Sequence, residues 1–177
     1  MSKSTAEHRA KAPSHVTFAL LTISTSRFKE LEAGKPVDNP SGETVVKLLE
    51  EAGHRVAYSA IIPDNTDMIG KSLRIIVEID DIDAVITCGG TGITKTDVTI
   101  ETVAPLLEKD LPGFGEIFRK LSYESIGAAA VITRATAGLL KEKVIFCLPG
   151  SPQGVELALK NLIIPEVGHI VKHVREQ

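Results

Sequence analysis

The stretch CGGTGITKTD, from Cys88 to Asp97, is the part of the sequence that decides the predicted fold. An apolar run of strand type, 84–87, comes directly before it, and a segment of helical character, 98–107, follows it. A glycine-rich turn between a buried strand and a helix lets backbone N–H groups approach an anion closely, and the helix N-terminus adds partial positive charge behind them. The stretch therefore predicts a phosphate-binding turn in an α/β protein.

Strand and helix patterns alternate along the rest of the chain, without an internal repeat or a low-complexity tract. The segment 27–41 is predicted to be a loop without a helix, because it contains Gly34, Pro36 and Pro40. The alternation predicts an α/β fold, a three-layer αβα sandwich with a mostly parallel central sheet. Apolar runs predict strands at 16–24, 56–62, 84–87, 128–133 and 143–148.

The composition is typical of a soluble globular protein. The chain has 177 residues, of which 43% are hydrophobic and 24% charged, and a net charge of -3 at pH 7. We expect residues 15–177 to form a single α/β domain and the polar segment 1–14 to be a disordered tail. No run reaches the ~18 apolar residues of a membrane span, and no basic block is present. Neither a membrane nor a nucleic acid is expected as a partner.

The cysteines give information about the cellular compartment. Cys88 and Cys147 lie far apart in the chain and form no C-x-x-C pair. This spacing argues against a zinc site, a redox dithiol and the disulfide framework of a secreted protein. A reducing compartment is the simpler setting, and we expect a cytoplasmic protein.

The glycine loop does not match the two common nucleotide-binding motifs. A dinucleotide fingerprint needs a third glycine, where the chain has Lys95 after Gly90 and Gly92. A P-loop needs a glycine directly before its lysine, where the chain has Thr94. A nicotinamide oxidoreductase is therefore disfavoured. By its sequence pattern alone, the loop could equally be an ordinary turn between a strand and a helix.

Four loops are expected to meet at one edge of the predicted sheet. Ser24, Asp64, the glycines from Gly89 to Gly92 and the small-residue loop Pro149–Ser151 each follow a predicted strand. Ligands of open α/β sheets bind outside the carboxyl ends of the strands. The sequence therefore predicts one ligand-binding crevice lined by these loops.

Two aspartates in these loops have two compatible interpretations. Asp64 and Asp97 each stand where the N-cap of a helix belongs, a structural role worth about 1 kcal/mol. Alternatively, both carboxylates point into the crevice and hold Mg²⁺ on nucleotide phosphates, because this ion prefers oxygen ligands. The sequence pattern leaves both interpretations open.

Several motifs resemble those of a known family. GGTG at 89–92 with DVT at 97–99, PGFGE at 112–116 with FR at 118–119, and PGSP at 149–152 occur in order. They are similar to the molybdenum cofactor biosynthesis proteins MoaB and MogA and to the molybdopterin-binding G domains of the plant protein Cnx1 and of gephyrin. The resemblance runs from about Val16 to about His169, and together the motifs are specific.

The resemblance implies a molybdopterin-binding α/β domain that assembles as trimers or hexamers. Active members of the family transfer AMP from ATP to the terminal phosphate of molybdopterin and release pyrophosphate. We therefore expect a Mg²⁺-dependent molybdopterin adenylyltransferase with ATP as co-substrate. A non-catalytic molybdopterin carrier or scaffold is the alternative, although the presence of Asp64 favours an active enzyme.

The family's functional residues transfer onto positions of this chain. Asp64 and Asp97 are expected to be catalytic and to hold the metal. The chain departs from many active members at Thr25, where they have Asp or Asn, and at 38–42, which is longer by one residue than their D-x-S-G motif. The residues expected to bind substrate and nucleotide are Ser24, Gly89, Gly90, Thr91, Gly92, Pro149, Gly150 and Ser151.

Overall fold

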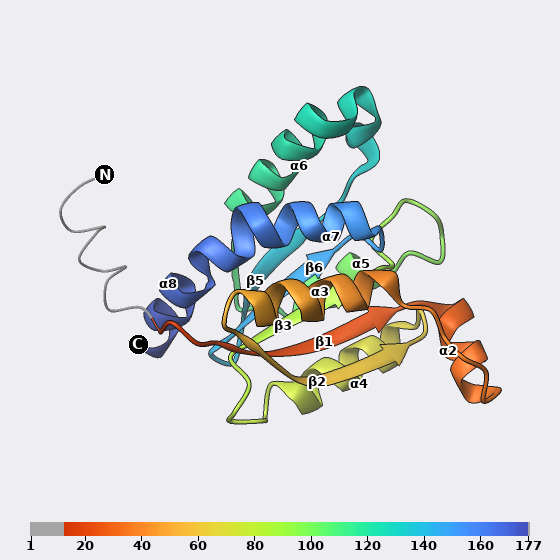
Figure 1. The fold of residues 1–177 in the computed structure, drawn as a ribbon, viewed down its shortest axis with the longest axis horizontal. Helices are drawn as coiled ribbons and strands as arrows, with labels where there is room; N and C mark the ends of the chain where they lie inside the picture. Colours follow the sequence, from red (N-terminus) through yellow and green to blue (C-terminus); the bar gives the residue numbers. More distant parts are fainter. Residues whose placement is uncertain (1–12, 177) are drawn as a thin grey trace.

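The computed structural model describes residues 13–176 and has one six-stranded sheet between two layers of helices (Figure 1). Of the tail predicted at 1–14, residues 1–12 lie outside this described part. The sheet order is β2-β1-β3-β6-β5-β4. The strands are β1 (Thr17–Ile23), β2 (Arg55–Ile62), β3 (Ala84–Cys88), β4 (Lys109–Asp110), β5 (Thr136–Leu140) and β6 (Lys143–Leu148).

Five strands of the sheet run in one direction, and β5 runs in the opposite direction. β2, β1, β3 and β6 pair in parallel, whereas β5 is antiparallel to β6 and to the short β4. The sheet is thus mostly parallel, and the predicted three-layer α/β architecture is confirmed.

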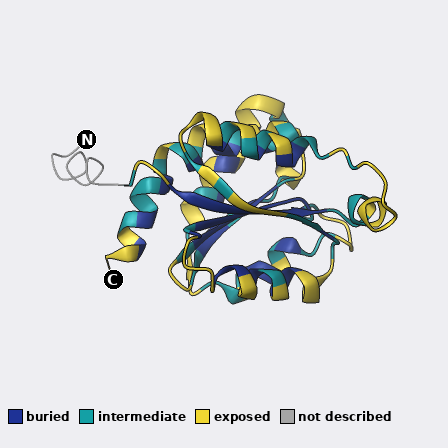
Figure 2. Cartoon of the chain, turned by 60° about the horizontal axis from the view of Figure 1, so that its bottom comes forward, coloured by how far each residue is buried: buried dark blue, intermediate teal, exposed yellow. Residues whose placement is uncertain are grey.

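Helices cover both faces of the sheet (Figure 2). Short 3₁₀ segments follow α5 and α6, and a π-helical turn joins α7 to α8. Pro165 lies in the first turn of α8, where a proline is tolerated because its missing N–H needs no partner within the helix. The α-helices are α2 (Thr25–Glu32), α3 (Pro40–Glu51), α4 (Thr66–Ile76), α5 (Thr99–Val103), α6 (Pro112–Ile126), α7 (Pro152–Ala158) and α8 (Ile164–Arg175).

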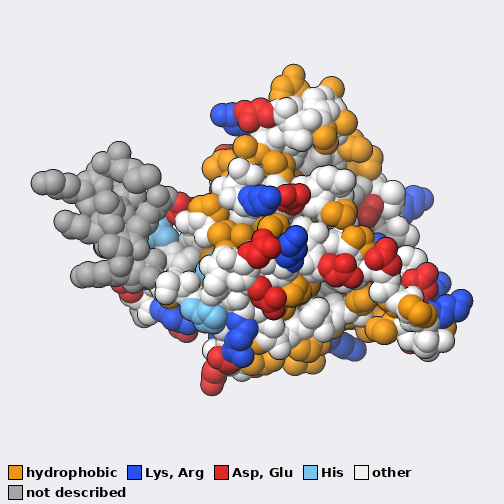
Figure 3. Space-filling model, viewed as in Figure 1, with side chains coloured by type: hydrophobic (Ala, Val, Ile, Leu, Met, Phe, Trp, Pro, Cys, Tyr) orange, Lys and Arg blue, Asp and Glu red, His pale blue; other side chains and the backbone are white. Residues whose placement is uncertain are grey.

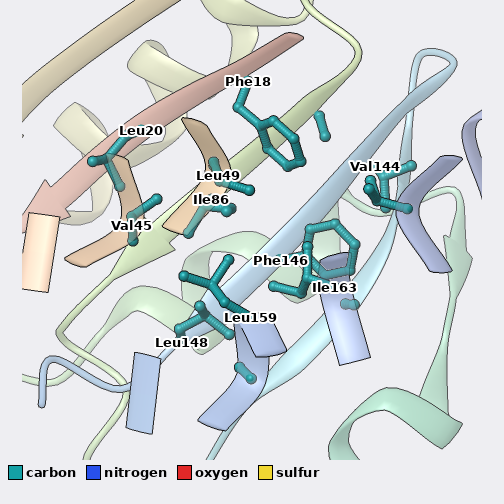
Figure 4. Packing of buried hydrophobic residues seen from close by; sticks show 14 of the residues in the cluster. Phe18, Leu20, Val45, Leu49, Ile86, Val144, Phe146, Leu148, Leu159 and Ile163 are labelled. Atoms are coloured by element: carbon teal, nitrogen blue, oxygen red, sulfur yellow. The ribbon is translucent and has the colours of Figure 1, made fainter. Parts of the chain in front are cut away.

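Alternating residues of the parallel strands supply two hydrophobic cores. Phe18, Ile86 and Phe146 point toward α3, α6, α7 and α8 (Figure 4). Leu21 and Ile145, on the opposite face, pack under α4 and α5. Burial of each such side chain contributes roughly 1.5–3 kcal/mol. Because both faces of β1, β3 and β6 are covered, these three strands are continuous apolar runs, which explains why the sequence predicts them well.

The strand predicted at 128–133 is wrong. Gly127–Ile132 is a 3₁₀ helix, and the strand β5 begins later, at Thr136. β5 and β6 are joined by Lys141 and Glu142, whose φ angles are +47° and +59°. Two-residue hairpin turns with positive φ normally contain Asn or Gly. Lys and Glu give no such signal, so the sequence does not reveal this hairpin.

The segment predicted as a loop at 27–41 is partly helical. α2 begins at Thr25, and its N-terminus is capped by the side chain of Ser24, which accepts a hydrogen bond from Arg27 N (3.5 Å). The helix ends before Gly34, which has a φ of +66°. The glycine and the prolines therefore restrict the chain only after the helix has ended.

Candidate functional site

A hollow of about 450 Å³ lies beyond the carboxyl ends of β1, β3 and β6. The order of the sheet places β2 on one side of β1 and β3 on the other, so the chain changes winding direction there. Such a switch point is where ligands bind in open α/β sheets. The hollow is lined by Ile23, Gly89, Gly90, Thr91, Gly92, Asp97, Ile132, Thr133, Arg134, Pro149, Gly150 and Ser151.

The glycine loop approaches its neighbours too closely for side chains. A β-carbon on Gly89 would lie 2.3 Å from the carbonyl oxygen of Ile23, and one on Gly90 would lie 2.4 Å from Thr99 Oγ1. Both glycines have positive φ angles, +108° and +62°. Thr99 fixes the loop, because its N–H donates to Gly90 O and its hydroxyl to Gly89 O, each at 2.9 Å.

Asp64 is held beside the glycine loop by Thr25. Its Oδ2 accepts hydrogen bonds from the backbone N–H and the hydroxyl of Thr25, both at 2.9 Å, and its own N–H donates to that hydroxyl at 3.0 Å. Its Oδ1 is 2.8 Å from the β-carbon position of Gly90. The N-cap of α4 is instead Asn65, which accepts from Met68 N (2.9 Å). The prediction that Asp64 caps a helix is therefore wrong.

Asp97 folds back onto its own loop. Its Oδ2 accepts hydrogen bonds from Thr94 N at 2.8 Å and from the Thr94 hydroxyl at 2.6 Å. The hydroxyl bond is the main cause that lowers the pKa of Asp97, and the positive charge of Arg134 acts in the same direction. The N-cap of α5 is Val98, without a side-chain hydrogen bond. The N-cap prediction for Asp97 is also wrong, and the residue is an ionised carboxylate at the wall of the hollow.

The loop Pro149–Ser151 packs against the glycine loop. A β-carbon on Gly150 would lie 3.3 Å from Gly89 Cα, and Gly150 O accepts a hydrogen bond from the Ser41 hydroxyl (2.6 Å). Ser151 is the N-cap of α7 and accepts a hydrogen bond from Gly154 N (3.2 Å). Two loops that are distant in the sequence thus form one wall.

Three side chains differ from the sequence-based prediction. Ser24 caps α2 and does not line the hollow, and Asp64 lies beside Gly90 without being one of the lining residues. Arg134, which the sequence interpretation missed, lines the hollow and forms an ion pair with Glu101. Arg134 follows the 3₁₀ segment that was predicted as a strand, so no pattern placed it near Asp97. Cys88 is buried at the end of β3, and burial raises the pKa of its thiol, so it is no nucleophile.

Residues 19–169 match the sequence family described as "Probable molybdopterin binding domain". The match spans most of the chain and includes every residue that lines the hollow. The chain belongs to this family.

Relatives of this molybdopterin-binding family member cover nearly the whole chain. It is 44% identical to "Molybdenum cofactor biosynthesis protein B" of Bacillus subtilis, over 96% of both chains. It is 45% identical to "Probable molybdopterin adenylyltransferase" of Methanocaldococcus jannaschii, over 92% of this chain and 96% of that protein. A crystal structure of a molybdenum cofactor biosynthesis protein B superposes with a TM-score of 0.86 at 43% identity, covering 94% and 100% of the two chains.

The carboxylates of this family member suit a metal ion whose coordination shell is completed by the substrate. Among residues 13–176, no group of three or more His, Cys, Asp or Glu side chains is arranged to hold a metal ion. Mg²⁺ is usually bound by one or two carboxylates together with substrate phosphates and water. Two carboxylates beside a glycine loop fit that pattern.

In the described part of the chain, no helix is long and apolar enough to cross a membrane.

Proposed function

We propose that this protein is a molybdopterin adenylyltransferase, which transfers AMP from ATP to the terminal phosphate of molybdopterin and releases pyrophosphate. The observation that carries the proposal is the placement of Asp64 and Asp97 against the glycine loop, beside Gly90 and Gly92 respectively. Hydrogen bonds from threonines orient both carboxylates. Relatives at 45% and 42% identity bear the names "Probable molybdopterin adenylyltransferase" and "Molybdopterin adenylyltransferase".

The reaction places particular demands on the site. An oxygen of the molybdopterin phosphate forms a bond to the α-phosphorus of ATP, and the bond from that phosphorus to the bridging oxygen breaks as pyrophosphate leaves. The nucleophile is already an anion, so the site needs no general base. The barrier lies in bringing anions together and in stabilising the leaving group, and positioning and electrostatic stabilisation lower it.

The residues in and beside the hollow have corresponding roles. Asp64 and Asp97 would hold Mg²⁺, which neutralises phosphate charge when it is bound. The backbone of Gly89–Gly92 cradles a phosphate or the pterin, and the loop Pro149–Ser151 closes the same wall. Arg134 supplies a guanidinium, whose planar donors match phosphate oxygens. Thr25 orients Asp64 and is a positioning residue.

We also propose that residues 15–177 act as one domain, in the cytoplasm, and as a homo-oligomer, a trimer or a hexamer. The oligomer is supported by an apolar surface on α6 and the 3₁₀ segment after it, where α6 projects from the sheet (Figures 1 and 3). Apolar surfaces of this kind mark protein contacts. The exposed side chains are Ile117, Tyr123, Ile126, Val131 and Ile132. Light scattering with Val131→Glu, which should dissociate the oligomer, tests this part.

The activity is tested by incubating the purified protein with ATP, Mg²⁺ and molybdopterin and measuring pyrophosphate. We expect release that depends on all three components and falls by at least about 100-fold in Asp64→Asn and Asp97→Asn, because each loses roughly 3 kcal/mol of electrostatic stabilisation. Asn keeps an oxygen that can accept the threonine hydrogen bonds, so the thermal midpoint should change little.

Two results would oppose the proposal. Full activity in both variants would mean that the carboxylates are not the catalytic residues. Tight molybdopterin binding by the wild-type protein, without pyrophosphate release, would indicate a carrier or scaffold instead. Circular dichroism of each variant shows whether a loss of activity comes with a folded protein.

A further inference from the structure

Two histidines on α8 meet through their ring nitrogens. His169 and His173 are one helical turn apart, and their Nε2 atoms are separated by 2.8 Å. The ring centroids are 4.5 Å apart, with 59° between the ring planes. The His173 side chain is 54% exposed and that of His169 23%, so solvent reaches the pair. The proposed adenylyl transfer uses neither residue.

The other ring nitrogens face carboxylates. His169 Nδ1 lies 3.3 Å from Glu166 Oε2, and His173 Nδ1 lies 3.9 Å from Glu176 Oε2. Glu176 also pairs with Lys172 at 3.6 Å. A histidine that ligates a metal usually donates its other ring N–H to a carboxylate, which fixes the tautomer and makes the ligating nitrogen more basic. In this cluster both Nε2 atoms converge while both Nδ1 atoms point toward acceptors.

We propose that His169 and His173 form a binding site for a divalent transition-metal ion, with Zn²⁺ as the probe. Two nitrogens on one tetrahedral Zn²⁺, each at about 2.0–2.1 Å, lie about 3.3 Å apart. A small rotation of the exposed His173 ring opens the observed 2.8 Å to that spacing. Within residues 13–176, no third His, Cys, Asp or Glu completes a site of three or more ligands, so this part of the chain leaves the remaining positions to water.

The histidine site is separate from the hollow. Arg175, at the end of α8, forms an ion pair with Asp83, which directly precedes β3. The glycine loop directly follows β3, a strand of five residues that spans about 17 Å. The two sites also differ in chemistry, because imidazole suits Zn²⁺ whereas Mg²⁺ prefers carboxylate, phosphate and water oxygens. Zn²⁺ at the histidines would therefore bind the protein without ATP or pterin.

The test titrates the EDTA-stripped protein with ZnCl₂ in competition with a chromophoric chelator. We expect one ion per chain at this site and a dissociation constant that rises at least about tenfold in His169→Gln and in His173→Gln, since losing even an outer partner of a metal ligand costs that much. His15→Gln removes another exposed imidazole and should leave the constant unchanged.

A second measurement separates coordination from nonspecific binding. In nitrogen-15 NMR spectra of the imidazoles, Zn²⁺ should shift Nε2 of both His169 and His173, while MgCl₂ at the same concentration should not. Zinc affinity that is equal in the wild type and both variants, or no zinc-dependent shift of either ring, would overturn the proposal. Both residues lie on solvent-accessible parts of α8, so the variants should fold.

Discussion

Aspartates lie beyond both ends of β3, and their side chains make different interactions at the two ends. At the amino end, Asp83 accepts a hydrogen bond from Thr17 N (2.9 Å) through one oxygen and forms an ion pair with Arg175 through the other. At the carboxyl end, the Oδ2 atom of Asp97 takes both hydrogen bonds from Thr94. Asp64 resembles Asp97 in this respect, because its Oδ2 atom accepts both hydrogen bonds from Thr25.

The difference is between acids that form ion pairs and acids that are oriented by uncharged donors. Around the amino end, Asp81 pairs with Arg55 and Glu78 with Lys141, so cations of the fold neutralise the acids there. At the carboxyl end, uncharged donors orient Asp64 and Asp97, and their negative charge remains available for a ligand. Carboxylates held in place without being neutralised are suited to a metal that arrives with its substrate.

The largest effect should come from inserting a methyl group between the carboxylate and the loop. In Gly90→Ala, the β-carbon would meet Thr99 Oγ1 at 2.4 Å and Asp64 Oδ1 at 2.8 Å, with a φ of +62°. We expect activity to be lost and the free energy of unfolding to fall by about 1–3 kcal/mol, measured by urea denaturation. In the control Gly113→Ala, nothing lies within 4 Å of the new carbon, so both properties should be kept.

The next prediction tests the role of the ion pair at the amino end of β3. Asp83→Asn breaks the ion pair with Arg175 but can still accept from Thr17 N. We expect a loss of about 1 kcal/mol in the free energy of unfolding, because the partner Arg175 is exposed, and pyrophosphate release within twofold of the wild type. Asp97→Asn should give the reverse pattern. A similar loss of activity in both variants would remove the distinction between the two ends.

A smaller effect is expected at Arg134. Arg134→Gln should raise the KM for ATP or for molybdopterin by about tenfold, equivalent to about 1.4 kcal/mol, because a phosphate loses its charged donor. Glu101→Gln, which removes the ion-pair partner of Arg134, should not raise KM. Steady-state kinetics with each substrate varied in turn checks both variants. An unchanged KM in Arg134→Gln would exclude the arginine from ligand binding.

The smallest effect concerns the ionisation of Asp97. Thr94→Val removes the hydroxyl that lowers its pKa, so that pKa should rise toward its ordinary value. A lowered pKa contributes stability above the unfolded pKa of about 3.9 and loses it as pH falls through the folded value. The variant should therefore lose this contribution, and near neutral pH both proteins keep the carboxylate ionised.

Carbon-13 NMR titration of the Asp97 carboxyl in metal-free protein measures this shift. Thr96→Val is the matched control, because Thr96 contacts the Thr94 hydroxyl (2.9 Å) rather than the carboxylate. An Asp97 pKa that does not move in Thr94→Val would show that the backbone N–H groups of Thr94 and Gly92, together with the charge of Arg134, are sufficient to lower it.

The sequence predicts the strands that pair in parallel better than the antiparallel strand β5. β1, β2, β3 and β6 are apolar or β-branched runs, and their prediction is confirmed. β5 was missed because Gly138 interrupts its pattern and the hairpin after it has no glycine or asparagine. Local propensity cannot report pairing that is set by contacts made across the fold.

The site shows the same limit. The family resemblance selected Asp64 and Asp97, but their bonding depends on details that sequence position does not contain. Thr25 reaches Asp64 from a helix that was predicted as a loop, and Arg134 reaches the hollow from a segment predicted as a strand. Capping was assigned one residue too early in both cases, since Asn65 and Val98 are the N-cap residues.

The contact between Gly150 and Gly89 has an evolutionary consequence. The two loops meet backbone to backbone, with 3.3 Å between the β-carbon position of Gly150 and Gly89 Cα. A side chain at Gly150 pushes against the glycine loop, which in turn has no room against Ile23 O. The two loops therefore cannot diversify independently. Mutant libraries that aim to change substrate preference should therefore randomise both loops together. A replacement in one loop is expected to preserve activity only when the other loop changes with it.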